Sequence, residues 1–146
     1  MTFDFKKAAG PFKGALGGVT WDGEGVLFSL LDEMEIKKYN PSDRSVSDFR
    51  LYTGRINGIA HDPSSKIVYA AQESGRRVIQ LLPDGSATVT ALRYQGAIHN
   101  HPTDVIFDSH ARIWFTDPYS TILAFGPQIF PLLSHASVRS EEHTSE

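Results

Sequence analysis

Two imidazoles stand two residues apart, at His99 and His101. In a β-strand this spacing puts both rings on one face, the arrangement of a zinc-binding pair. No third ligand stands nearby in the sequence, and Pro102 would end a strand at this point. We therefore favour the lining of a loop or channel over a metal site for this pair.

A carboxamide and two guanidinium groups are the next candidates for ligand chemistry. Asn57, which precedes Gly58, could face a channel, or it could be there because Asn tolerates left-handed backbone. Arg76 and Arg77 would suit a basic clamp on a substrate, but an exposed, charged hairpin is the interpretation we favour.

Three aspartates recur along the chain, at positions 22, 62 and 108, and are 40 and 46 residues apart. Each follows a short apolar segment and opens a polar turn, where Asp caps nearby backbone N–H groups. We therefore predict turn formation rather than metal binding for all three. A repeat of roughly 40 to 50 residues with several short strands is typical of a β-propeller blade.

The elements that position these side chains are short strands separated by turns that contain Pro, Asn, Asp or Gly. No stretch keeps a 3.6-residue apolar period, so helices should be minor. We predict an all-β, partial β-propeller of about two and a half four-stranded blades. The blades are expected at about 17–52, 55–92 and, incompletely, 103–138, with an irregular insertion at 119–133.

Apolar residues of the third unit are expected to pack between blades. Trp114 and Phe115 alternate across a strand and would contribute to this packing. Because the unit lacks its outer strands, we expect four side chains to lack a covering blade: Val105, Phe107, Ile113 and Phe115.

The last eight residues, RSEEHTSE at 139–146, share none of this patterning. They resemble the translation of a sequencing adapter, so we expect them to lie outside the fold and the native sequence to be a fragment that stops near Val138.

Composition excludes several classes of protein. The chain has 14 Lys and Arg against 17 Asp and Glu, with no basic run, which argues against nucleic-acid or anionic-membrane binding. It has no cysteine, which excludes disulfides and thiolate zinc sites. No apolar stretch approaches the ~20 residues of a membrane span, and the N-terminus lacks a signal-type apolar core. We expect a cytoplasmic protein, and its oligomeric state stays open.

Five strings carry a family resemblance, and they occur in order between Gly17 and Tyr119: GGVTWDGEGVLFS, GRINGIAHD, ESGRRVIQLLPDG, NHPTDVIFD and RIWFTDPYS. Together they resemble the senescence marker protein/gluconolactonase/luciferin-regenerating-enzyme family, also called regucalcin-like. The resemblance implies a six-bladed β-propeller with an axial divalent metal, calcium or zinc, that hydrolyses small sugar lactones.

The resemblance also implies site residues, with two departures from the family pattern. Gly17 stands where the family has a metal-binding Glu, and Thr103 where it has an Asn. No metal ligand and no catalytic residue of the family falls within this chain, so we expect a fragment that is inactive alone. The implied substrate-binding residues are Asn57, Asn100, His101, Thr103 and Asp104. The alternative is a non-catalytic propeller that binds a small ligand or a protein partner through its central channel.

Overall fold

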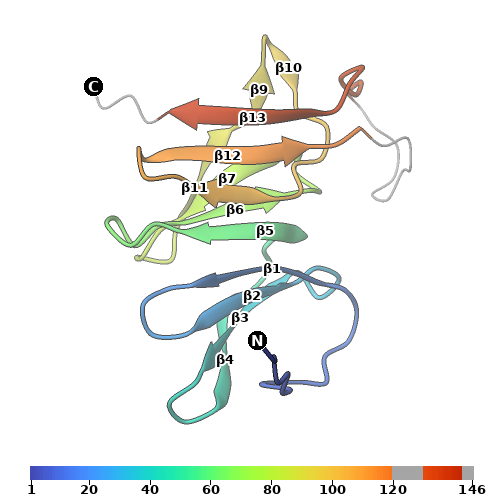
Figure 1. The fold of residues 1–146 in the computed structure, drawn as a ribbon. Helices are drawn as coiled ribbons and strands as arrows, with labels where there is room; N and C mark the ends of the chain where they lie inside the picture. The colour runs from blue at the N-terminus through green and yellow to red at the C-terminus, as the bar shows by residue number, and fades with distance from the viewer. Residues whose placement is uncertain (120–129, 143–146) are drawn as a thin grey trace.

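The computed structural model describes residues 1–119 and 130–142 of the chain, and all regular structure in these residues is β-strand (Figure 1). No helix long and apolar enough to cross a membrane occurs among them. The strands are β1 (Leu16–Trp21), β2 (Val26–Leu30), β3 (Glu35–Asn40), β4 (Ser45–Arg50), β5 (Ile56–His61), β6 (Val68–Gln72), β7 (Arg77–Leu81), β8 (Ala87–Ala91), β9 (Arg93–Tyr94), β10 (Ala97–Ile98), β11 (Val105–Phe107), β12 (Arg112–Asp117) and β13 (Ser137–Glu142).

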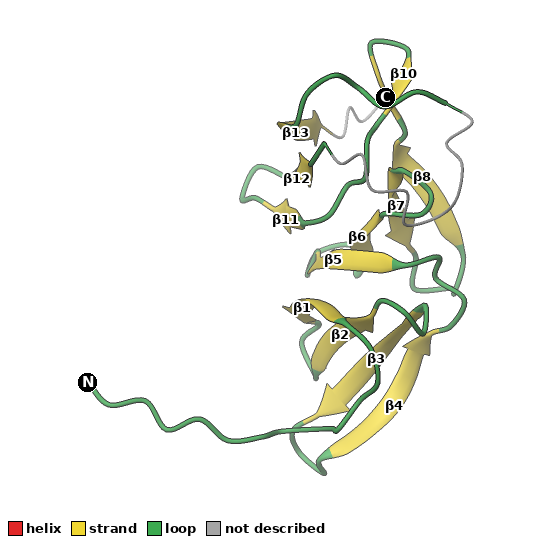
Figure 2. Cartoon of the chain, turned by 90° about the vertical axis from the view of Figure 1, so that its right-hand side faces the viewer, coloured by secondary structure: helices red, strands yellow, loops and turns green. Residues whose placement is uncertain are grey.

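Eleven of the strands form three antiparallel sheets that follow one another along the chain and stack face to face (Figures 1 and 2). Sheet one contains β1 to β4, sheet two β5 to β8, and sheet three β11 to β13, each in sequence order. The first strand of sheet two, β5, contacts the first strands of both neighbouring sheets, β1 and β11. The architecture is a partial β-propeller, which confirms the fold predicted from the sequence. A small β9–β10 hairpin was not predicted.

Sheet two is apolar on both faces because it is covered on both sides. Every residue of β6 (VYAAQ) is buried. One core lies between sheets one and two and consists of Leu27, Ile36, Ile56, Ile59, Val68, Ala70, Ile79 and Leu81. The other lies between sheets two and three and consists of Ala60, Tyr69, Ala71, Val78, Ala91, Val105, Ile113 and Phe115.

The inner strands approach one another so closely that two glycines are required. A Cβ on Gly18 would lie 2.7 Å from the backbone N of Ile59, and one on Gly58 would lie 2.6 Å from Cα of Asp104. The Gly58 N–H also donates to the Thr103 carbonyl at 2.7 Å. Backbone is in contact with backbone at both places, so no side-chain rearrangement could make room.

The third sheet corrects the expectation about uncovered side chains. Val105, Ile113 and Phe115 are buried against sheet two, and Phe107 packs against the same core. Strand alternation allows either face to be the covered one, and the exposed apolar residues prove to be Ile106 and Val138, which are 59% and 69% exposed.

The expected boundary at residue 139 differs from the structure. Arg139–Glu142 lie in β13 and pair with β12, so four residues of the segment expected outside the fold complete sheet three. The edge of β12 offers unpaired N–H and C=O groups that an extended segment can satisfy, and Arg139 Nε donates to Asp117 Oδ2 at 3.1 Å. Residues 143–146 lie outside the described residues, as does most of the predicted insertion at 119–133. The origin of the terminal octapeptide stays a prediction.

The contact at Gly58 generates a stability prediction. Gly58→Ala should lower the free energy of unfolding by about 1–3 kcal/mol, because the added methyl overlaps the backbone of β11. Urea denaturation followed by circular dichroism measures the change. Ser47→Ala, on an exposed strand position, is the control and should leave the midpoint unchanged. Equal midpoints for both variants would contradict the close approach.

Candidate functional site

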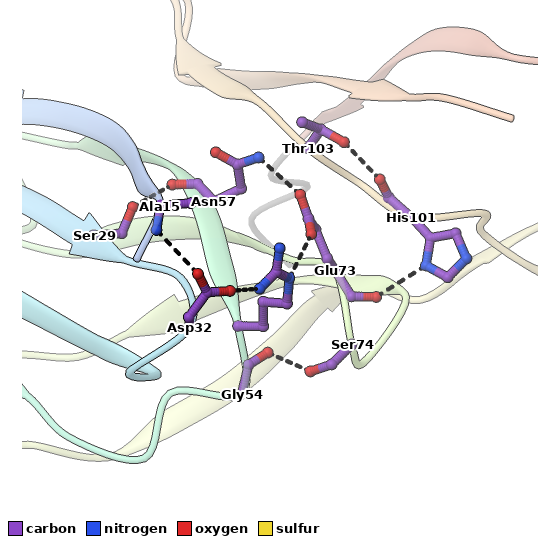
Figure 3. A network of polar contacts seen from close by, with 10 residues as sticks. Ala15, Ser29, Asp32, Gly54, Asn57, Glu73, Ser74, His101 and Thr103 are labelled. Atoms are coloured by element: carbon purple, nitrogen blue, oxygen red, sulfur yellow. Dashed lines mark hydrogen bonds and ion pairs between the residues drawn. The ribbon is translucent and has the colours of Figure 1, made fainter. Parts of the chain in front are cut away.

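A chain of polar contacts lies where the inner strands meet, and it includes residues from the turns after β2 and β6 (Figure 3). Asn57 Nδ2 donates to Glu73 Oε1 at 2.7 Å, and Arg55 Nε donates to Glu73 Oε2 at 3.2 Å. The Arg55 guanidinium also forms an ion pair with Asp32. We call Asp32, Arg55, Asn57 and Glu73 the polar cluster.

Backbone contacts attach the polar cluster to sheet one and to the segment that precedes β11. Ser29 Oγ in β2 donates to the Asn57 carbonyl at 2.7 Å, and the Ala15 N–H donates to Asp32 Oδ2 at 3.0 Å. His101 Nδ1 lies 3.2 Å from the Glu73 carbonyl oxygen, and Thr103 Oγ1 donates to the His101 carbonyl at 2.8 Å (Figure 3). The segment that precedes β11 is thereby held next to the polar cluster.

The charges within the polar cluster stabilise each other. The Ala15 N–H and the Arg55 guanidinium lower the pKa of Asp32, and the Asp32 carboxylate raises the pKa of Arg55. One guanidinium serves two carboxylates, so the polar cluster carries a net negative charge at neutral pH.

Four of the five predicted ligand-contacting residues come together here. Asn57, His101 and Thr103 take part in the contacts described above, and Asp104 lies directly against Gly58. The Asp104 side chain is exposed, and its Oδ1 accepts a hydrogen bond from the Val105 N–H at 2.9 Å.

Asn100 is placed differently from the other four. It is fully buried, and its Nδ2 donates to the His135 carbonyl at 3.0 Å while its Oδ1 accepts from the Leu133 N–H at 2.7 Å. Both ends of the amide bind backbone, so in this structure Asn100 holds a loop and presents no group to a ligand.

The prediction that Arg76 is an exposed charge on a hairpin is wrong. It is only 7% exposed, and its Nε donates to the carbonyls of His99 and Asn100 at 2.7 and 2.9 Å. Its Nη1 and Nη2 donate to the carbonyls of Phe130 and Pro131 at 2.8 and 3.1 Å. The guanidinium joins two loop segments, because its five donors match carbonyls that have no strand partner.

The two histidines do not form a pair. The buried His99 ring packs edge-on against Phe115, with Nδ1 3.6 Å from Asp117 Oδ2, whereas His101 contacts Glu73. Across residues 1–119 and 130–142, no group of three or more His, Asp or Glu side chains could hold a metal ion.

The comparisons with solved structures identify the fold. The chain superposes on a gluconolactonase from Xanthomonas campestris with a TM-score of 0.76 and 26% identity, covering 86% of this chain and 43% of that one. A second structure, assigned as a gluconolactonase, gives a TM-score of 0.79 at 20% identity, with 92% and 47% covered. This chain is gluconolactonase-like. It spans less than half the length of either structure.

A further solved structure resembles the chain more weakly. An inactive H270A virginiamycin B lyase from Staphylococcus aureus, solved with quinupristin, gives a TM-score of 0.56 at 21% identity, over 72% of this chain and 36% of that one. That likeness concerns the fold alone. No protein-family model and no curated protein sequence matches the chain.

The metal that the resemblance implies does not fit the residues of this gluconolactonase-like chain. Position 17, the family's Glu position, has no side-chain oxygen, and a Cβ there would lie 2.6 Å from Leu31 Cδ1 and Ser29 Oγ. The same Cβ would lie 2.8 Å from Asn57 Oδ1, so a carboxylate could enter only if all three side chains moved. A hard cation needs several oxygen ligands, and these residues do not supply them.

Sequence reasoning missed Asp32, Arg55 and Glu73. Their three positions lie in separate turns, at 32, 55 and 73, and no local spacing connects them. The only signal was the GRING string, in which Arg55 and Asn57 alternate and therefore share a side of the chain.

The three repeat aspartates are turn residues, as predicted. Asp22 Oδ1 accepts from the N–H groups of Glu24 and Gly25, Asp62 from those of Ser64 and Ser65, and Asp108 from those of His110 and Arg112. The Trp114 indole N–H, 2.8 Å from Asp108 Oδ2, is the largest influence that lowers the pKa of Asp108. For Asp22 and Asp62, burial raises the pKa, but the hydrogen bonds together lower it by more, so the pKa of each is lowered overall.

These turns predict acid sensitivity. All three folded-state pKa values lie below the ordinary value of 3.8, so the carboxylates contribute stability above about pH 4 and lose it as the pH falls through the folded values. The urea midpoint should therefore decrease as the pH is lowered from 5 to about 2. Asp108→Asn should make the midpoint depend less on pH. An unchanged slope would contradict a contribution of the Asp108 carboxylate to acid sensitivity.

The polar cluster predicts a cost for neutralising its central carboxylate. Glu73→Gln should lower the free energy of unfolding by about 1–3 kcal/mol, because the new amide would turn N–H groups toward Arg55 or Asn57. The matched control is Glu24→Gln, whose side chain is 82% exposed and should change stability by less than about 0.5 kcal/mol. Equal effects in thermal or urea unfolding would show that the polar cluster contributes nothing.

Proposed function

We propose that the protein to which these residues belong hydrolyses small sugar lactones, and that the polar cluster with His101, Thr103 and Asp104 forms part of the lactone-binding wall. The observation that carries the proposal is the convergence of these side chains at the meeting point of the inner strands, within a gluconolactonase-like fold.

The residues near the polar cluster offer complementary groups to a polyhydroxylated ring. Asp104 has an exposed carboxylate, which accepts hydrogen bonds from hydroxyl groups, and the Thr103 hydroxyl can accept one while it donates to His101. Glu73 fixes the orientation of the Asn57 amide, because Asn57 Nδ2 donates to the Glu73 carboxylate. The excess negative charge disfavours anionic substrates and is compatible with a neutral lactone.

Hydrolysis also needs activation of water, and we assign that role to no described residue of this chain. The described residues also offer no set of ligands for a divalent cation. The chain alone is therefore proposed to be inactive toward lactones.

A non-catalytic propeller that binds a ligand through its channel is the second candidate. The feature that favours it is Gly17, which leaves the family's carboxylate position without an oxygen ligand.

The discriminating experiment is pH-stat hydrolysis of glucono-δ-lactone by protein expressed from the whole natural reading frame. Activity that falls at least tenfold on chelation and returns with calcium, zinc or manganese is the expected result, and it would place the metal ligands outside this chain. Asp104→Asn should then raise KM more than it lowers kcat. Binding of the lactone without turnover under every metal condition would favour the second candidate.

A further inference from the structure

A groove of about 530 Å³ lies between sheets one and two, where the sheets diverge toward β4 and β8 (Figure 2). It is lined by residues 50–53, by Gln72 at the end of β6, and by residues of β7 and β8. None of the residues of the polar cluster lines it. Its volume is in the range of small-molecule binding sites, about 300–1,000 Å³. We call it the outer groove.

The floor of the outer groove is apolar. Ile79 pairs with Val89 and Leu81 with Ala87, so these four side chains share one face of sheet two. Ile79 and Leu81 belong to the core between sheets one and two, whereas Ala87 is exposed and Val89 is 42% exposed. The core therefore continues into the outer groove as an apolar surface that a ligand can reach.

Arg77 stands beside this floor, in a fixed position. It shares the face of Ile79 by strand alternation, and its Nε donates to Gln72 Oε1 at 2.6 Å. Gln72 is fixed in turn, because its Nε2 donates to the Thr53 carbonyl at 2.6 Å. Arg77 forms no ion pair with a carboxylate in residues 1–119 and 130–142, so its charge is not neutralised by a direct partner there.

Arg50 brings a second guanidinium to the outer groove from sheet one. Its Nη1 and Nη2 donate to the carbonyls of Phe49 and Leu82 at 2.9 and 2.6 Å. The Asp84 carboxylate is nearby: hydrogen bonds from the Ser86 hydroxyl and N–H lower the pKa of Asp84, and the charge of Arg50 lowers it further. No described Asp or Glu lines the outer groove itself, so two guanidinium groups against one neighbouring carboxylate leave an excess of positive charge.

Two donors in the lining of the outer groove have no acceptor. Thr53 is 7% exposed, and its buried hydroxyl has no hydrogen-bond partner among the residues that the structure describes. Arg50 Nε is likewise buried without a partner among these residues. A buried donor without an acceptor costs free energy, and the oxygen atoms of an anion are acceptors that would recover it.

We propose that the outer groove binds a small organic anion with an apolar body, an aromatic phosphate or carboxylate. The anionic group would accept hydrogen bonds from Arg77 and Arg50, because guanidinium donors match the oxygen atoms of phosphate and carboxylate groups. The apolar body would lie on Val89 and Ala87, and the exposed Tyr52 ring at the rim would cover it. This site is separate from the proposed lactone-binding wall.

Calorimetric titration with phenyl phosphate tests the proposal on protein expressed from the whole natural reading frame. Phenol and inorganic phosphate are titrated in parallel, because they supply the apolar body and the anion separately. The expected result is one phenyl phosphate bound per chain, at least tenfold more tightly than either smaller compound. No binding of phenyl phosphate, or equal affinity for phenol or for inorganic phosphate, would overturn the proposal.

Substitutions at the outer groove locate the binding. Arg77→Gln should weaken phenyl phosphate binding about tenfold, because it removes a charge-assisted hydrogen bond. Arg93→Gln is the matched control, since it removes the same charge from an exposed residue of β9 outside the outer groove. Val89→Glu should abolish binding by placing a like charge beside the anion, at a position exposed enough to accept it.

Thr53→Val separates ligand binding from a structural role. The hydroxyl has no partner to lose, so the free energy of unfolding should not fall, whereas the affinity for phenyl phosphate should fall about tenfold. The same affinity in the parent, Arg77→Gln and Val89→Glu would overturn the proposal. Binding is measured without a lactone, so this result does not depend on whether the protein hydrolyses one.

Discussion

The close approach of β1, β5 and β11 is the constraint on which the rest of the structure depends. At Gly18 and Gly58 the backbones of neighbouring sheets are separated by less than a side chain would need. Stacked sheets ordinarily lie about 10 Å apart, so backbone contact is possible only where the sheets converge at their inner edges. The sheets diverge from this inner edge toward β4 and β8 (Figure 2).

The polar cluster follows from this geometry. Asn57 directly precedes Gly58, and Thr103 accepts the Gly58 N–H, so the strand that makes the tight contact also fixes where the candidate ligand-contacting groups lie. Side chains from sheets one and two and from the segment before β11 can meet there only because the backbones already do. The Arg55 guanidinium pairs with both Asp32 and Glu73, and so reduces the repulsion between these two carboxylates.

The repeat, the strands and the aspartate turns could be predicted because they depend on local alternation and on short-range capping, as at Asp62. The roles of Arg76 and Asn100 could not, because their backbone partners at 99–100, 130–131 and 133–135 are distant in sequence. Alternation also cannot say which face of a strand is covered. For this reason Val105 was expected to be uncovered, whereas the exposed residue is its neighbour Ile106. The pairing of Arg139 with β12 could not be predicted from composition, because it depends on the open edge of that strand.

The positions of the tryptophans have an optical consequence. The chain contains two, Trp21 and Trp114, and each lies on a different uncovered face of the stack. The Trp21 indole is half exposed, whereas that of Trp114 is hydrogen-bonded to Asp108 beneath the Arg112 guanidinium. Both faces thus carry an intrinsic fluorophore, so any sheet that covers either one must change the emission of an indole. Quenching by iodide would separate the two signals, because the more exposed indole is reached first.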